Sequence, residues 1–333
     1  MNGIYPGLTF GKATRDAYGE ALRDLGAKHS DIVVLDADLA KSTKSFTFGE
    51  VYPDRFWNVG IQEANMVGMA GGFASSGKVP FISSFAAFVI LKGYDQLRMA
   101  VSYPKLNVKV CGSHGGISIG EDGASQQSVE DIALACALPD FVVCVPCDEH
   151  QMRAVVQAAY EHDGPVYIRS GRPKAPLIYD ATPADFRFGK ATRLREGGDV
   201  TIIANGLMVG AALVAHEELK REGVAARVVD MATVKPLDVD EVRAAAADTG
   251  AIVTAEEHLL HGGLGARVAQ AVAATHPVPM EFVGLDDTYA ESGDPEALMW
   301  KYGLTAKEVG DAVRRVLPRR ADHSTAVGAG ARR

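Results

Sequence analysis

The chain has 333 residues, of which 47% are hydrophobic and 23% charged, and its formal net charge is −8. This is the composition of a globular protein long enough for two domains. The negative charge disfavours nucleic acid or an anionic membrane as a partner, because no broad positive field is present to attract them. No apolar run approaches the roughly 20 residues that cross a bilayer, and the first residues lack the apolar segment of a secretory signal. We therefore expect a cytoplasmic protein.

Short apolar segments alternate with amphipathic segments from the N-terminus onward. This pattern is typical of an α/β fold in which mostly parallel strands are flanked by helices. The apolar segments predict strands at residues 32–35, 79–82, 108–111, 141–145 and 166–168. Helical periodicity predicts helices at residues 12–28, 63–75 and 150–160. We assign these elements to one domain, residues 5–175.

A stretch with little periodicity follows, and its prolines and paired glycines predict a linker at residues 176–195. The alternation then resumes, with predicted strands at 200–204, 226–229, 252–254 and 280–283 and helices at 209–222 and 265–275. Gly223 follows the first of these helices, where a glycine can adopt the left-handed conformation of a C-cap. We predict a second α/β domain over residues 196–318 and a disordered, Arg-rich tail over residues 319–333.

Four cysteines lie close together in the sequence, at Cys111, Cys136, Cys144 and Cys147. The last two form a C-x-x-C, but a zinc site would need a second pair or histidines at ligand spacing. Because Cys144 sits in the apolar run FVVCVPC, we interpret these residues as buried thiols and assign them no role.

Glu63 stands at a predicted strand-to-helix junction in the segment RFWNVGIQEANMVGMAGGFASSG. An acid in the first turn of a helix is favoured by the helix dipole, which is a purely structural role. The small residues that follow Glu63 would also allow a flat ligand or another backbone to approach closely. The residues alone leave both roles open.

The segment NVGIQEANMVGMAGG resembles the glutamate motif of the transketolase family. Further segments resemble family blocks in family order: KATRDAYGEAL, VVLDADLAKST, SSFAAFVILKGYDQLRMA, HGGISIGEDGASQQSVEDIAL, TVKPLD, EEHLLHGGLG and ESGDPEALMWKYGL. The G-D-G…Asn motif, which holds Mg²⁺ and the diphosphate in that family, does not occur in the chain. The resemblance therefore implies a pyrimidine-binding domain followed by a transketolase C-terminal domain, with the diphosphate-binding domain on a separate N-terminal subunit.

This resemblance implies transfer of a two-carbon ketol unit from a ketose phosphate to an aldehyde, with thiamine diphosphate as the cofactor. It places the Mg²⁺ ligands on the partner subunit and none on this chain, and it implies a two-plus-two heterotetramer. The main alternative is the β subunit of a 2-oxo acid dehydrogenase E1 component, which shares the size, the domain pair and the glutamate. A non-catalytic subunit and a deoxyxylulose-phosphate synthase are further alternatives. The phosphate-binding residues and GEDGASQQ favour a transketolase.

The resemblance assigns Glu63 as the carboxyl that hydrogen-bonds N1′ of the cofactor's aminopyrimidine. A carboxyl in a dry pocket can serve there as a proton relay, while the cofactor supplies the reactive carbon. Phe85 and Phe88 would pack on the pyrimidine, with Asp38 nearby, although core packing alone also explains aromatics at i and i+3. Leu91 replaces a third aromatic that many bacterial members carry.

For the substrate, the resemblance indicates a phosphate-binding group made of Arg15, Ser42, His114 and Arg172. Guanidinium and imidazole donors suit a terminal phosphate, because charge-assisted hydrogen bonds select it over a neutral hydroxyl. Arg169 competes with Arg172, since the segment RSGR leaves the register open by three residues.

Two loop residues complete the implied substrate site. Asp122, in GEDGAS, would contact a sugar hydroxyl. Gln126 stands where most relatives have a histidine, and together with His114 it would handle the donor hydroxyl. A glutamine amide can orient that hydroxyl but cannot relay its proton near neutral pH.

The segment EEHLLHGG groups Glu256, Glu257, His258 and His261. It invites a metal-binding interpretation, but it lacks the i, i+4 helical spacing of a zincin. We predict instead a loop of the C-terminal domain at a subunit interface.

Overall fold

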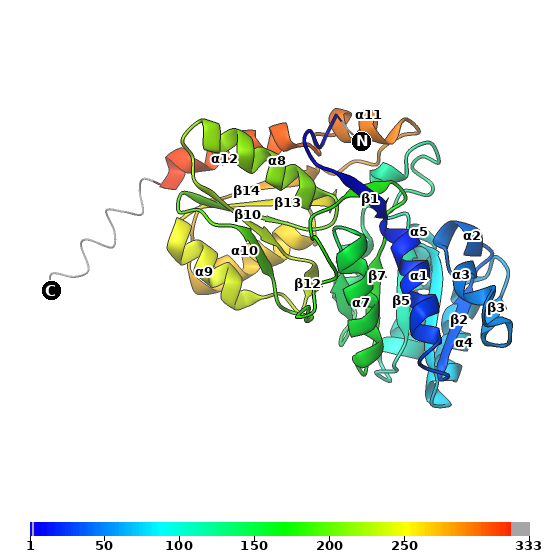
Figure 1. The fold of residues 1–333 in the computed structure, drawn as a ribbon. Coiled ribbons are helices and arrows are strands. Elements are labelled where there is room, and N and C mark those ends of the chain that lie inside the picture. The colour runs from blue at the N-terminus through cyan, green and yellow to red at the C-terminus, as the bar shows by residue number, and fades with distance from the viewer. Residues whose placement is uncertain (2, 321–333) are drawn as a thin grey trace, which may run out of the picture.

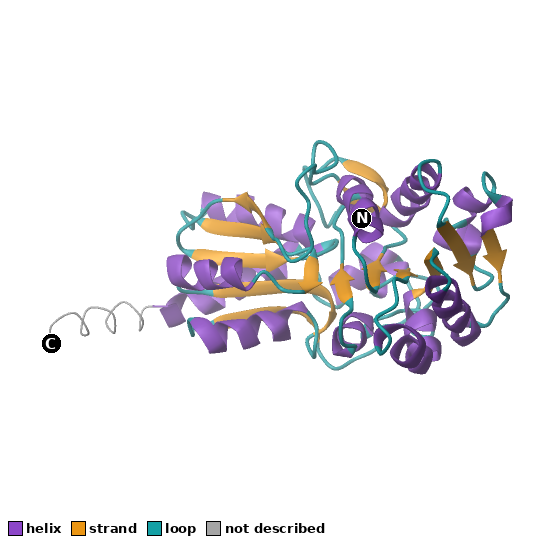
Figure 2. Cartoon of the chain, turned by 90° about the horizontal axis from the view of Figure 1, so that it is seen from below, coloured by secondary structure: helices purple, strands orange, loops and turns teal. Residues whose placement is uncertain are grey.

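The structure is a computed structural model that describes residues 1 and 3–320. The chain forms two α/β domains that lie side by side (Figure 1), each a sheet with helices on both faces (Figure 2). A short antiparallel ribbon of β1 (Phe10–Ala13) and β8 (Lys174–Pro176) joins the start and the end of the first domain. Within the described residues, no helix is long and apolar enough to cross a membrane. The predicted fold class is confirmed.

The first domain is built on a seven-stranded sheet with the order β12-β6-β7-β5-β4-β2-β3. Its strands are β2 (Ile32–Asp36), β3 (Phe56–Asn58), β4 (Val79–Phe85), β5 (Lys109–Ser113), β6 (Val142–Cys144), β7 (Val166–Arg169) and β12 (Thr233–Lys235). All of them run parallel except β12, which pairs antiparallel with β6 at the edge. Parallel strands buried on both faces read as continuous apolar runs, which is why the sequence predicted β2, β4, β5, β6 and β7 but not the short, less buried β3.

Helices cover both faces of this sheet, because successive residues of a strand point to opposite sides. Ile32 and Val34 pack with α1 and α7, whereas Val33 and Leu35 pack with α4, α5 and α6. The helices are α1 (Thr14–Gly26), α2 (Ala40–Thr43), α3 (Phe46–Gly49), α4 (Glu63–Ser75), α5 (Ala86–Gln96), α6 (Asp131–Ala137) and α7 (Glu149–Glu161), with short turns at Pro53–Arg55, Leu97–Ser102 and Ile117–Ile119.

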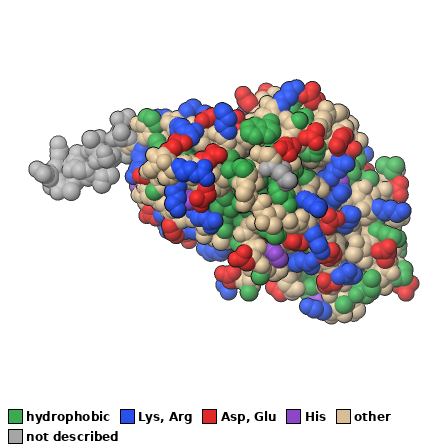
Figure 3. Space-filling view, turned by 45° about the horizontal axis from the view of Figure 1, so that its top comes forward, with side chains coloured by type: hydrophobic (Ala, Val, Ile, Leu, Met, Phe, Trp, Pro, Cys, Tyr) green, Lys and Arg blue, Asp and Glu red, His purple; other side chains and the backbone are tan. Residues whose placement is uncertain are grey.

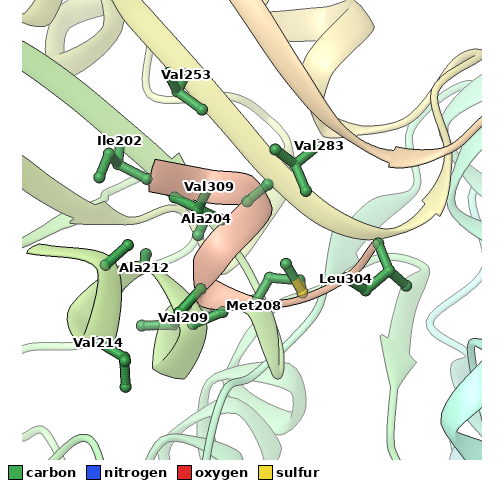
Figure 4. Packing of buried hydrophobic residues seen from close by; sticks show 14 of the residues in the cluster. Ile202, Ala204, Met208, Val209, Ala212, Val214, Val253, Val283, Leu304 and Val309 are labelled. Atoms are coloured by element: carbon green, nitrogen blue, oxygen red, sulfur yellow. The ribbon is translucent and has the colours of Figure 1, made fainter. Parts of the chain in front are cut away.

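The second domain has a five-stranded sheet with the order β14-β13-β10-β11-β9. Its strands are β9 (Thr192–Arg195), β10 (Val200–Ala204), β11 (Ala226–Asp230), β13 (Ile252–Leu259) and β14 (Met280–Leu285), and its helices are α8 (Met208–Arg221), α9 (Val239–Thr249), α10 (Leu264–Thr275), α11 (Pro295–Lys301) and α12 (Ala306–Arg320). Figure 4 shows the core on one face, where Met208 and Val209 of α8 and Val309 of α12 meet the strand residues Ile202 and Val253. Helices α9 and α10 cover the other face.

Several predicted boundaries differ from the structure. The first helix begins at Thr14 and not at residue 12, because the residues before it pair with β8 in the ribbon. The predicted linker, 176–195, ends in β9, which pairs antiparallel with β11 and so belongs to the second sheet. Of the predicted tail, Arg319 and Arg320 close helix α12, and residues 321–333 lie outside the described part of the chain. Gly223 has a φ of +83°, as predicted for a C-cap.

Strand β12 ties the two domains together. After β11, the chain leaves the second domain and adds β12 to the edge of the first sheet, where Thr233 lies opposite Cys144. Cys111, Cys144 and Cys147 are buried free thiols, as interpreted from the sequence, whereas Cys136 is a free thiol that is only half-buried. Basic and acidic side chains are interspersed over the outer face seen in Figure 3.

A buried ion pair at the domain interface reinforces this connection. Arg169, at the end of β7, pairs with the Asp131 carboxylate at 3.0 Å, and Tyr167 donates a hydrogen bond to the same oxygen at 2.7 Å. Arg169 also donates to the carbonyl of Glu257 in β13 and to the carbonyl of Ser128. The side chain of Arg169 is 5% exposed and that of Asp131 is 0% exposed. A charge so deeply buried needs this full set of partners.

We expect Arg169→Met to lower the free energy of unfolding by about 3–5 kcal/mol, because it leaves Asp131 charged and without its cation inside the protein. Arg172→Met, three residues away, is the matched control. Arg172 pairs with the exposed Glu121, so we expect a loss of at most about 1 kcal/mol. Urea denaturation of both variants measures the difference. Equal losses would show that the Arg169 network does not hold the domains.

Candidate active site

The predicted site residues gather at one edge of the first sheet. The carboxyl ends of parallel strands meet at the same edge, and ligands of such sheets bind there. Asp38 and Ser42 follow β2, Glu63 follows β3, Phe85 ends β4 and Phe88 comes soon after it, His114 follows β5, Arg172 follows β7, and Arg15 lies in the first turn of α1 after β1. The topology therefore brings together residues that are up to 157 positions apart, as the contact of Thr14 with Gly171 shows.

Glu63 is the first residue of α4 and is 3% exposed. The hydroxyl of Ser84 donates to Glu63 Oε1 at 3.4 Å. The ammonium of Lys92 lies 3.7 Å from Glu63 Oε2. The Glu63 carboxyl is thus buried at a helix N-terminus, with one oxygen held by a hydroxyl and the other beside a cation. The sequence did not single out Ser84 or Lys92.

Lys92 links this carboxyl to a pair of aromatic rings, because its ammonium also lies 4.2 Å from the centroid of the Phe88 ring. Phe85 and Phe88 are stacked, with ring centroids 5.6 Å apart and an interplanar angle of 23°. Phe85 also lies against the His114 ring, at 4.0 Å between centroids. Leu91, on the same helix, is 52% exposed. A flat aromatic face next to a hydrogen-bonding carboxyl fits a heteroaromatic ring such as an aminopyrimidine, which can stack and hydrogen-bond at once.

Arg15 and His114 form a hydrogen-bonded pair. Arg15 Nη1 donates to the carbonyl of Ser42 at 3.1 Å and to His114 Nε2 at 2.9 Å. Because arginine can only donate, His114 Nε2 must accept, so its proton is on Nδ1 and is donated to Ser113 Oγ at 2.8 Å. Burial, together with the charges of Arg15, Arg172 and Lys44, lowers the pKa of His114 to about 3. His114 is therefore neutral throughout the physiological pH range.

Arg15 keeps an unused donor. Among the described residues, its Nε is buried without a hydrogen-bond partner. A buried guanidinium with a free N–H is suited to an anionic group of a ligand, because charge-assisted hydrogen bonds are stronger than neutral ones. The uncharged His114 beside it adds no charge, and both of its ring nitrogens are engaged, Nε2 by Arg15 and Nδ1 by Ser113.

The two candidate arginines differ in their surroundings. Arg169 is buried in the ion pair with Asp131, and its donors are directed into the domain interface. Arg172 is 36% exposed, donates to the Ile119 carbonyl and pairs with Glu121 at 2.8 Å. Its charge acts on the pKa of His114, so it belongs to the same cluster as Arg15. This geometry favours Arg172 as the residue that can reach a ligand.

The remaining loop residues lie at the rim. Asp38 is exposed, has a left-handed φ of +66° and accepts a hydrogen bond from Asn58 Nδ2 at 2.9 Å. Its neighbour Asp36, which the sequence analysis missed, is buried and accepts hydrogen bonds from three groups: Leu39 N, Thr43 Oγ1 and Ser45 Oγ. Burial raises the pKa of Asp36 to about 6. These contacts fix the turn that carries Ser42.

Asp122 and Gln126 lie in the loop after the turn Ile117–Ile119. Asp122 is exposed, whereas Gln126 is half-buried and accepts a hydrogen bond from Ser125 Oγ. The next residue, Gln127, is buried and donates to the carbonyl of Glu291 at 3.1 Å, in the second domain. Gln127 therefore anchors the loop, and Gln126 is the glutamine with a side chain at the surface.

The prediction that Glu256, Glu257 and His258 lie in a loop is wrong. These residues lie on β13 and are buried. Glu256 accepts hydrogen bonds from Leu264 N and Gly265 N at the start of α10. Glu257 accepts a hydrogen bond from Ser118 N in the first domain, at 2.7 Å. Within residues 1 and 3–320, no group of three or more His, Cys, Asp or Glu side chains is arranged to hold a metal.

Comparisons with known proteins agree with this geometry. Residues 11–176 match the family described as transketolase, pyrimidine binding domain, and residues 189–309 match that described as transketolase, C-terminal domain. These two matches cover the first and the second domain of the fold.

Individual relatives extend the match to most of the chain. The 6-deoxy-6-sulfo-D-fructose transketolase subunit of Clostridium sp. is 43% identical over 92% of this chain and 95% of its own length. The transketolase of Homo sapiens is 38% identical over 91% of this chain but only 48% of its own length. These names leave the 2-oxo acid dehydrogenase alternative with less support.

A solved structure, described as a split gene transketolase in an inactive beta4 tetramer, has a TM-score of 0.88 and 48% identity. The match covers 93% of this chain and all of that one. The chain thus matches the whole length of the split gene transketolase but only about half the length of the human transketolase. It belongs to the transketolase family, of which it carries the pyrimidine-binding and C-terminal domains.

Proposed function

We propose that this chain is one subunit of a thiamine-diphosphate-dependent transketolase, which transfers a two-carbon ketol unit from a ketose or ketose phosphate to an aldehyde. The observation that carries the proposal is that a buried carboxyl, Glu63, and the stacked rings of Phe85 and Phe88 lie at the same edge of the first sheet, with Lys92 in contact with both Glu63 and Phe88. This is the pyrimidine half of a cofactor site. The other half, which binds the diphosphate and Mg²⁺, belongs to a separate subunit, most simply in a two-plus-two assembly with symmetric sites.

Glu63 is the residue of this chain that handles a proton of the cofactor. When bound, thiamine diphosphate supplies the carbon nucleophile that takes up the two-carbon unit. Glu63 would form a hydrogen bond with the pyrimidine nitrogen of the bound cofactor; its carboxyl is buried, and Ser84 donates a hydrogen bond to one of its oxygens. Phe85 and Phe88 orient the ring against that carboxyl. Asp38 lies at the rim of the same pocket.

The cluster of Arg15, Ser42, His114 and Arg172 binds the anionic end of the sugar. Two guanidinium groups supply charge, and the neutral His114 holds the Arg15 guanidinium in place by accepting a hydrogen bond at Nε2. A relative named for 6-deoxy-6-sulfo-D-fructose indicates that a terminal sulfonate is also an anion that this family handles. Asp122 and Gln126 contact hydroxyl groups of the sugar from the loop, and Gln126 orients the donor hydroxyl without titrating.

We expect Glu63→Gln to slow hydrogen–deuterium exchange at C2 of the bound cofactor by about 10²–10⁴-fold, because an amide keeps the shape but cannot relay a proton. The exchange is measured by NMR after acid quench, on this chain combined with a diphosphate-binding subunit. Glu50→Gln, an exposed carboxyl outside the site, is the control and should leave the rate unchanged. An unchanged rate in Glu63→Gln would remove Glu63 from the mechanism.

We expect Arg172→Ala to raise the KM for a phosphorylated sugar donor by about 10- to 100-fold, the worth of a hydrogen bond to a charged group. The kcat with hydroxypyruvate, which has no phosphate, should stay close to that of the parent, since the reacting atoms are untouched. Steady-state kinetics with both donors measures this, with Arg221→Ala of α8 as the control. Equal damage with both donors would make Arg172 a structural residue.

A further inference from the structure

Lys92 lies between the aromatic face and the carboxyl of the candidate site. Its ammonium is 4.2 Å from the centroid of the Phe88 ring and 3.7 Å from Glu63 Oε2. The lysine side chain is 51% exposed, whereas that of Glu63 is 3% exposed. Lys92 therefore reaches from the surface to the buried Glu63 carboxyl, and its ammonium also lies over the Phe88 ring.

The packing of α4 against α5 explains this placement. Phe88 and Lys92 are four residues apart on α5, so they lie on the same face of the helix. The next residue, Gly93, lies against the start of α4: a Cβ placed on it would be 3.1 Å from Val67 Cγ2 and 3.7 Å from the Glu63 carbonyl oxygen. Because the two helices approach so closely there, the side chain beside Gly93 is within reach of the Glu63 carboxyl.

The two contacts of Lys92 are those that a bound ring would need. A cation over an aromatic face and an ion pair with a carboxylate both stabilise the lysine where it is. A flat heteroaromatic ring that stacked on the face of Phe88 under the ammonium and hydrogen-bonded to Glu63 Oε2 would need the place that the ammonium occupies. The lysine head group and such a ring cannot occupy this place together.

We propose that Lys92 closes the pyrimidine half-site of this chain when no cofactor is bound, and that the aminopyrimidine ring must displace its ammonium from Phe88 and Glu63. The inference rests on the proposed function, since it takes the aminopyrimidine as the ligand of Glu63. Lys92 therefore lowers the affinity for the cofactor, and it keeps the buried Glu63 carboxylate paired until the ring binds. It is not a group that takes part in the reaction.

The test is the affinity of thiamine diphosphate for Lys92→Met in the complex with a diphosphate-binding subunit, measured by isothermal titration calorimetry. Methionine keeps the apolar stem and removes the charge. Displacing one exposed ion pair and one cation–π contact corresponds to roughly a three- to thirtyfold change in Kd, so the variant should bind the cofactor that much more tightly. Lys92→Arg keeps the cation and should bind as the parent does. Lys78→Met, at an exposed position outside the site, controls for lost charge.

The chain alone gives a second readout that needs no partner. NMR titration with 4-amino-5-hydroxymethyl-2-methylpyrimidine should show tighter binding to Lys92→Met than to the parent or Lys78→Met. An unchanged or weaker cofactor affinity of the Lys92→Met complex would overturn the inference and leave the proposed function standing. Failure of the parent complex to bind thiamine diphosphate at all would overturn both.

Discussion

The common direction of the strands in the first sheet is the constraint on which the site depends. Because β2, β3, β4, β5 and β7 run parallel, each ends at the same edge, and the chain emerging from each end delivers one part of the site. The Glu63 carboxyl and the stacked rings of Phe85 and Phe88 come to this edge from the ends of two different strands, β3 and β4. Reversing one of these strands would send its site residue to the opposite edge.

The second domain stabilises that edge without contributing the pyrimidine pocket. Strand β12 extends the first sheet, and Arg169 joins the end of β7 to β13 through the Glu257 carbonyl. Glu257 in turn holds the turn before the loop of Asp122 and Gln126 by accepting from Ser118 N. The loop that we propose to contact the substrate is thus anchored from both domains, which links the packing of the C-terminal domain to the geometry of the site.

Much of this organisation could be predicted from the sequence. The buried parallel strands are continuous apolar runs, and Glu63 opens α4 at the residue where the helix was predicted to begin. The sequence could not reveal β12, a three-residue strand that leaves its own domain to pair with β6. Nor could it separate Arg169 from Arg172, because three positions of spacing do not say which guanidinium meets Asp131. Lys92 escaped notice for a similar reason: its role depends on how closely α5 approaches α4 at Gly93.

The central claim is that this chain holds half of a cofactor site and needs a second subunit to complete it. The most direct measurement is ketol transfer from hydroxypyruvate to an aldehyde acceptor, assayed with thiamine diphosphate and Mg²⁺ for this chain, for the diphosphate-binding subunit and for their mixture. The account predicts no turnover by either subunit alone and activity that saturates at a one-to-one ratio of the two. Robust ketol transfer by this chain alone would contradict it.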